Sequence, residues 1–144
     1  MKLYTYTRER SLARMALKGI PESFPMWGSL VDAAATSEMD QEPNDRMVVL
    51  EVDVDGIEDT IIVTGERVEE VATMAQEEVD SDSEIEEGPE KDKAAEKAYT
   101  DVYDSAENLS GLQDMIQKFD VVENSEGISP SRVKVLGVPK IEYT

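Results

Sequence analysis

The stretch Met47-Val-Val-Leu-Glu-Val-Asp-Val-Asp55 decides the fold class, because it is the most regular apolar pattern in the chain. Apolar and acidic residues alternate along it, which is the period of a β-strand with one buried and one solvated face. Asp55-Gly56 ends this strand in a turn, and the apolar run Thr60–Thr64 is expected to pair with it as a hairpin or to continue it after a bend. The buried face is expected to hold Val48, Leu50, Val52 and Val54.

Upstream of this strand, the pattern indicates a strand followed by two helices. Leu3–Thr7 is rich in β-formers, and the apolar spacing within Arg8–Lys18 predicts a helix that Gly19 ends. A second short helix is predicted over 29–37, where Ser29 and Asp32 resemble a capping box.

Downstream of Thr64, the apolar residues recur with helical spacing until two final predicted strands. The order of elements predicts an α+β protein with a mixed or antiparallel sheet and flanking helices. We expect a single domain over 1–144, with an acidic, mobile segment at about 80–92. The predicted elements are helices over 65–79 and 91–104, a helix containing Leu109, Leu112, Met115 and Ile116, and strands over 119–122 and 132–138.

Charge is distributed unevenly along this chain, whose net charge is -19. Residues 1–18 have a local charge of +4, whereas residues 69–92 have a local charge of -10. So acidic a chain is not expected to bind nucleic acid directly, because phosphate contacts need a basic face. A basic protein surface is the expected partner, unless the charge only serves solubility. The predicted partner-binding residues are Glu77, Glu78, Asp80, Asp82, Glu84, Glu86 and Glu87.

The chain has no cysteine and no histidine, which excludes disulfides, thiol catalysis and the usual ligands of zinc, copper and haem. The acidic turn 53–59 lacks the ligand spacing of a calcium-binding EF-hand, so no metal site is predicted. No secretion signal or apolar span is found, and a cytoplasmic location is expected, that of the host if a phage encodes the protein.

Two further features each allow two interpretations. The basic helix that contains Arg8, Arg10 and Arg14 could bind an anion, or the acidic segment could fold back on it. Trp27, in the densest aromatic stretch of the chain, is either a core anchor or the floor of a pocket.

Several motifs, in the order in which they occur along the chain, also resemble those of a known family. The motifs that carry the resemblance are Leu3-Tyr-Thr-Tyr-Thr7, the helix closed by Gly19-Ile20, the Trp27 segment, the strand Val48–Val54 and the terminal Arg132-Val133. Together they resemble the split ADP-ribosyltransferase fold, including its small bacterial and phage relatives. The resemblance covers most of 1–65 and 118–138.

This resemblance implies an NAD site in which Thr5, Tyr6 and Thr7 line the nicotinamide pocket, Trp27 and Ser29 belong to the second motif, and Asp120 or Glu123 supplies the catalytic carboxylate. Thr5 stands where the family has histidine or arginine, which implies a degenerate enzyme whose scaffold survives as a binding module. The leading hypothesis is therefore a non-enzymatic, phage-encoded interaction or inhibitor protein with no cofactor. Its acidic surface is expected to bind the basic surface of a partner that itself binds nucleic acid. The alternative is an NAD-binding ADP-ribosyltransferase-like protein or enzyme, and a third hypothesis is a virion or scaffold component.

Overall fold

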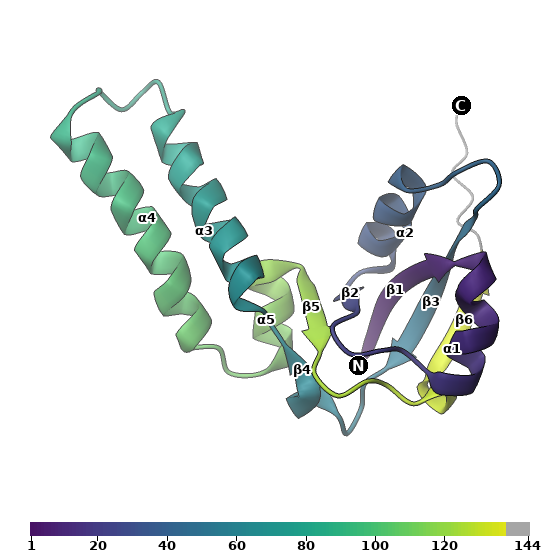
Figure 1. The fold of residues 1–144 in the computed structure, drawn as a ribbon. Coiled ribbons are helices and arrows are strands. Elements are labelled where there is room, and N and C mark those ends of the chain that lie inside the picture. The colour runs from purple at the N-terminus through teal and green to yellow at the C-terminus, as the bar shows by residue number, and fades with distance from the viewer. Residues whose placement is uncertain (138–144) are drawn as a thin grey trace. The chain divides into compact units, whose positions relative to one another are not determined.

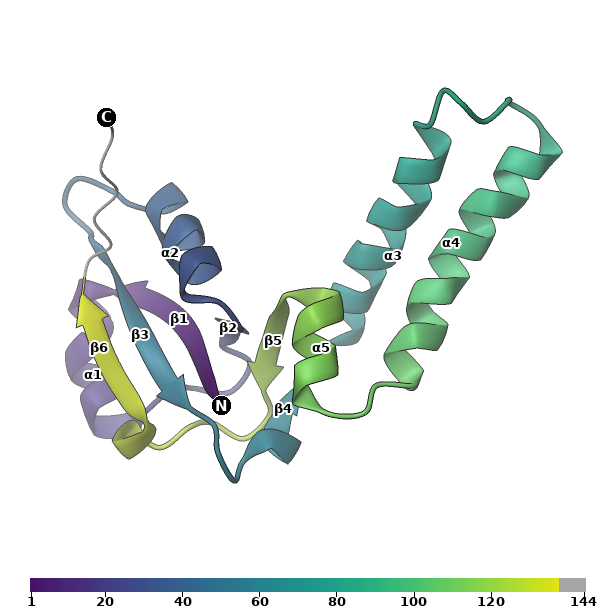
Figure 2. The same cartoon turned by 180° about the vertical axis from the view of Figure 1, so that it is seen from behind.

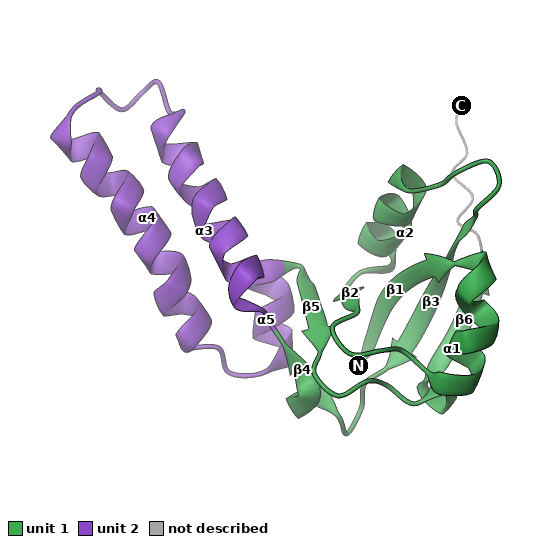
Figure 3. Cartoon of the chain, in the orientation of Figure 1, with its two compact units in different colours: residues 1–62, 120–144 green, residues 63–119 purple. Residues whose placement is uncertain are grey.

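The computed structural model describes residues 1–137, and the chain divides into two compact units (Figure 3). The first unit comprises residues 1–62 and the segment from 120 onward, and the second comprises residues 63–119. The expected single domain over 1–144 stays a prediction.

The first unit is built on a six-stranded sheet in the order β4-β5-β2-β1-β3-β6 (Figure 1). Every pair of neighbouring strands is antiparallel, so the predicted α+β class is confirmed and the sheet is antiparallel rather than mixed. The strands are β1 (Lys2–Arg8), β2 (Pro25–Trp27), β3 (Met47–Asp53), β4 (Ile61–Ile62), β5 (Val121–Asn124) and β6 (Val133–Gly137). The predicted strand over 132–138 is thus β6, and Val138 lies outside the described residues.

The predicted strand over 47–55 is β3, and it lies between β1 and β6. Its register with β1 is continuous from Lys2↔Asp53 to Arg8↔Met47. Leu50 and Val52 are fully buried, as the alternation predicts, but Met47 and Val49 on the other face are also buried. A helix covers each face of this part of the sheet, which explains why the first half of β3 is apolar on both sides.

These two helices are α1 (Leu12–Lys18) and α2 (Leu30–Met39) (Figures 1 and 2). Met15 of α1 packs on Val48 and Leu50, whereas α2 packs on β1, β2 and β3. The predicted start of the first helix at Arg8 is wrong, because Arg8 still pairs with Met47 in the sheet and a 3-10 turn over 9–11 precedes α1.

The two short strands, β2 and β4, follow from tertiary pairing. The sequence analysis assigned no strand to Pro25–Trp27, which pairs with β1 and β5. β4 pairs with β5 and not with β3, so the hairpin, one of the two arrangements expected for Thr60–Thr64, is wrong. Phe119, predicted to begin a strand, ends a helix instead, because Asp120 adopts a positive φ of 60° before β5 starts.

The second unit consists of three helices: α3 (Gly65–Asp80), α4 (Pro89–Glu107) and α5 (Leu112–Phe119). α3 and α4 pack along their length as a hairpin, and α3 also contacts α5. The irregular segment between α3 and α4 is 81–88, shorter than the predicted 80–92, because Pro89 starts α4 at the position where a proline is best tolerated. Within residues 1–137, no helix combines the length and apolar character that crossing a bilayer requires.

Candidate functional site

The acidic residues predicted to bind a partner lie together around the turn of the α3–α4 hairpin. Three of them, Glu77, Glu78 and Asp80, are exposed in the last turn of α3. The other four lie in the connecting segment 81–88 and are exposed except for Asp82, which is half-buried: Asp82, Glu84, Glu86 and Glu87.

A buried lysine organises this turn. Lys91 is only 4% exposed, and its Nζ donates to the backbone carbonyl of Asp82 at 3.2 Å and to the Glu87 carboxylate at 3.0 Å. The Asp82 carboxylate in turn accepts the amide of Glu84 at 3.0 Å. Asp82 and Glu87 therefore hold the loop, and sequence reasoning missed Lys91, although it is the only cation in the acidic stretch 69–92.

Further along α3, a shallow groove of about 430 Å³ combines acidic and apolar groups. Met74, one of its lining residues, is 63% exposed. The groove is lined by Glu66, Glu69, Glu70, Thr73 and Met74. Arg67 pairs with Glu70 at 2.9 Å, whereas Glu66 and Glu69 are in no ion pair within residues 1–137. This groove was not predicted from the sequence, although the exposed Met74 lies outside the apolar positions that predict the helix, Val68, Val71, Ala72, Ala75 and Val79.

The three residues predicted to line a nicotinamide pocket lie on two faces of the sheet. Thr5 is fully buried and its hydroxyl donates to the carbonyl of Pro25 at 2.7 Å. Thr7 points to the same face and lines a pocket beside α1. Tyr6, between them in the alternating strand, points to the face that α2 covers.

Tyr6 is held by two contacts on that face. Its ring stacks on Trp27, with centroids 5.4 Å apart and planes 24° apart, and its hydroxyl donates to Asp40 at 2.6 Å. Burial, together with the hydrogen bond to Asp40, raises the pKa of Tyr6 to about 12. The hydroxyl is thus a hydrogen-bond donor at neutral pH.

Trp27 and Ser29 have structural roles in this arrangement. Trp27 is 9% exposed within β2, where it pairs with Tyr4 and Val121 on the neighbouring strands. This burial agrees with the interpretation of Trp27 as a core anchor. Ser29 caps α2, and its Oγ accepts the amide of Asp32 at 3.5 Å, as the predicted capping box requires.

Of the two candidate carboxylates, Asp120 directly precedes β5 and Glu123 lies within it. Asp120 is exposed in the link from α5 to β5. Glu123 pairs in register with Pro25 and Ile62 and therefore shares a face of the sheet with Trp27, two residues from Pro25. The sheet thus brings Tyr6, Trp27 and Glu123 to one face and leaves Thr5 and Thr7 on the other.

Among residues 1–137, no group of three or more carboxylates is arranged to hold a metal ion. The chain matches no protein-family model, and no curated protein or solved structure is significantly similar to it. The geometry of its own residues is therefore the basis for any functional assignment.

Proposed function

We propose that the helical unit is an acidic docking surface for a basic, amphipathic segment of a partner protein. The observation that carries this proposal is the groove on α3, where the exposed Met74 lies among Glu66, Glu69 and Glu70. An apolar side chain surrounded by carboxylates is complementary to a helix with one apolar and one cationic face.

Uncompensated charge supports this proposal. Residues 63–119 contain 17 acidic and 5 basic side chains, a net charge of -12. In the described part of the chain, ion pairs in this unit involve only Glu70, Glu87 and Asp101 among the acids. The remaining carboxylates produce a negative field that accelerates encounter with a cationic partner and repels nucleic acid.

Met74 supplies the apolar contact that charge alone lacks. Methionine is flexible and polarisable, and it is common at surfaces that adapt to more than one partner. Nucleic-acid-binding proteins have basic clefts that normally contact the phosphates of nucleic acid. An acidic surface would bind such a cleft in place of those phosphates, so inhibition of a nucleic-acid-binding protein is the favoured form of this function.

The test is binding of a fluorescent peptide to the full chain, measured by anisotropy at low and high salt. The probe is an amphipathic helical peptide of leucine, lysine and arginine, and a scrambled peptide of the same composition lacks the apolar face. We expect the amphipathic peptide to bind more tightly than the scrambled one, with an affinity that falls as salt rises.

Matched variants locate the binding surface. The pair Glu66→Gln and Glu69→Gln is expected to weaken binding about tenfold, and Met74→Ser alone by a similar factor. The control pair Glu84→Gln and Glu86→Gln removes the same charge from the loop and should have a smaller effect. Equal losses in both pairs, with no effect of Met74→Ser, would reject the groove as the docking site.

The second candidate function is an ADP-ribosyltransferase-like NAD site, as the resemblance of the sequence implies. It is favoured by the common face of Tyr6, Trp27 and Glu123, on which the half-buried Tyr6 ring, stacked on Trp27, shares one side of the sheet with a carboxylate. Calorimetric titration with NAD tests it. Heat that disappears in Glu123→Gln but persists in Glu126→Gln would support it, and absence of heat at millimolar NAD would exclude it.

A further inference from the structure

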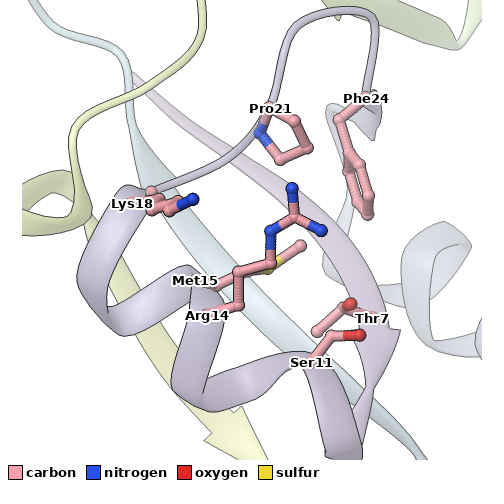
Figure 4. A pocket seen from close by; sticks show the side chains of 8 residues that line it. Thr7, Ser11, Arg14, Met15, Lys18, Pro21 and Phe24 are labelled. Carbon is pink, nitrogen blue, oxygen red and sulfur yellow. The ribbon is translucent and has the colours of Figure 1, made fainter.

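A pocket in the first unit has no part in the acidic surface. It lies beside α1, has a volume of about 390 Å³ and opens between the end of β1 and the segment that follows Gly19 (Figure 4). This volume is at the lower end of the range for small-molecule sites. Its lining residues are Thr7, Ser11, Arg14, Met15, Lys18, Gly19, Pro21 and Phe24.

Two cations of α1 face this pocket without an acidic partner. Arg14 and Lys18 are four residues apart and therefore neighbours on one side of the helix. Neither is in an ion pair among residues 1–137, whereas the nearby Arg8 and Arg10 both pair with Asp45. Two cations that no carboxylate of the described residues neutralises attract a small anion to the pocket that they line.

A buried hydroxyl also points into the pocket without a partner. Thr7 is 7% exposed, and its hydroxyl makes no hydrogen bond within residues 1–137. In that part of the chain, every side-chain polar atom that is sealed from solvent has a hydrogen-bond partner. Because the Thr7 hydroxyl has no partner, it is in contact with solvent, and it opens into the pocket that Thr7 lines. Figure 4 shows it beside the Ser11 hydroxyl, which adds a second neutral donor.

The pocket also has apolar lining residues. Met15 belongs to the core with Val48 and Leu50, and the half-buried Phe24 packs against the same cluster. The Arg14 guanidinium extends toward the gap between Pro21 and Phe24 (Figure 4), so the cationic and apolar walls meet there. A ligand that uses both walls needs an anionic head group next to an apolar group.

We propose that this pocket binds a small organic anion, a carboxylate or phosphate monoester that carries one apolar ring or short chain. Arg14 and Lys18 bind the head group, the Thr7 and Ser11 hydroxyls donate to it, and Met15 and Phe24 contact the apolar group. The sequence left anion binding by the basic helix open as one of two interpretations. The missing acidic partner of Arg14 and Lys18 in the described residues favours the anion.

The test is titration of the full chain with phenyl phosphate, benzoate, inorganic phosphate and benzylamine, followed by calorimetry and by the amide chemical shifts of 7–24. We expect phenyl phosphate or benzoate to bind with shifts confined to that segment, inorganic phosphate to bind about tenfold more weakly than phenyl phosphate, and benzylamine not to bind. The stronger of the first two identifies the head group.

Charge-matched variants separate this site from general attraction. The pair Arg14→Gln and Lys18→Gln changes exposed side chains and should lower the affinity at least about tenfold. The control pair Arg46→Gln and Lys134→Gln removes the same charge from exposed positions of this unit outside the pocket, and should leave the affinity unchanged. Thr7→Val, checked for folding by thermal melting, is expected to lower the affinity for the organic anion that binds. Absence of binding by both organic anions at millimolar concentration, or equal losses in the two pairs, would overturn the proposal.

Discussion

The carbonyl oxygen of Ile128 occupies the space that a side chain on Gly19 would need, since a Cβ built on Gly19 would lie 1.8 Å from that oxygen. The next residue, Ile20, exchanges two backbone hydrogen bonds of 2.9 Å with Ile128. This contact joins the end of the first helix to a segment far along the chain, and Gly19 also lines the pocket beside α1.

Gly19→Ala should destabilise the first unit by about 3 kcal/mol or more, because it adds a clash with backbone to an unfavourable φ of +77°. Gly56→Ala is the matched control. Gly56 has a φ of +86° but no atom within 4 Å of a built Cβ, so only backbone strain of about 1–2 kcal/mol is expected. Urea unfolding measures both, and equal losses would mean that the chain at Ile128 moves aside.

Ionisation of Tyr6 should lower stability at high pH. Burial and the hydrogen bond to Asp40 raise the pKa of Tyr6 to about 12 in the folded chain, compared with 10.0 for a free tyrosine. The unfolded chain therefore loses this proton first, and the stabilisation, complete below pH 10, is lost as the pH rises toward 12.

Ultraviolet absorbance of phenolate measures this titration. Tyr103 also titrates late, because a hydrogen bond with Tyr99 and burial raise its pKa to about 12. Tyr6→Phe is expected to remove part of the late absorbance step and to reduce the loss of stability above pH 10, and Tyr103→Phe should remove another part of the step. An unchanged late step in Tyr6→Phe would contradict the assignment.

Salt should stabilise the helical unit, because its net charge of -12 is concentrated in 57 residues and repels itself. The triple variant Glu77→Gln, Glu78→Gln and Glu90→Gln should protect the α3 and α4 amides from hydrogen exchange better than the native chain at low salt, and should respond less to added salt. The control triple variant carries Glu22→Gln, Glu42→Gln and Glu126→Gln in the first unit. An equal gain in the control would contradict a local origin of the repulsion.

Lys91→Met should destabilise the hairpin by about 1–3 kcal/mol, because it removes both the donor to the Asp82 carbonyl and the partner of Glu87. Lys97→Met in the same helix is the control. Lys97 pairs with Asp101 at 2.8 Å on the surface, where solvent screens the pair and it contributes little to stability. Comparable losses in the two variants, measured by thermal unfolding, would show that the buried lysine does not hold the turn.

The sequence by itself determined the elements whose signals are local. The alternation of apolar and acidic residues predicted β3, the Ser29 cap predicted α2, and helical spacing predicted α3, because each pattern is complete within one segment. Charge counts likewise located the acidic surface, since most of its carboxylates remain exposed in the folded chain.

Tertiary structure alone decided what depends on partners distant in sequence. β2 and β4 are too short to have a pattern of their own and exist because β5 pairs with both. Packing also decided which helix covers each face of β1, so that Thr5 and Thr7 lie on the side of α1 and Tyr6 lies on the side of α2. The pocket beside α1 combines a buried hydroxyl, two cations and an aromatic ring only after α1 has packed on the sheet, because these groups come from β1, from α1 and from the segment after Gly19.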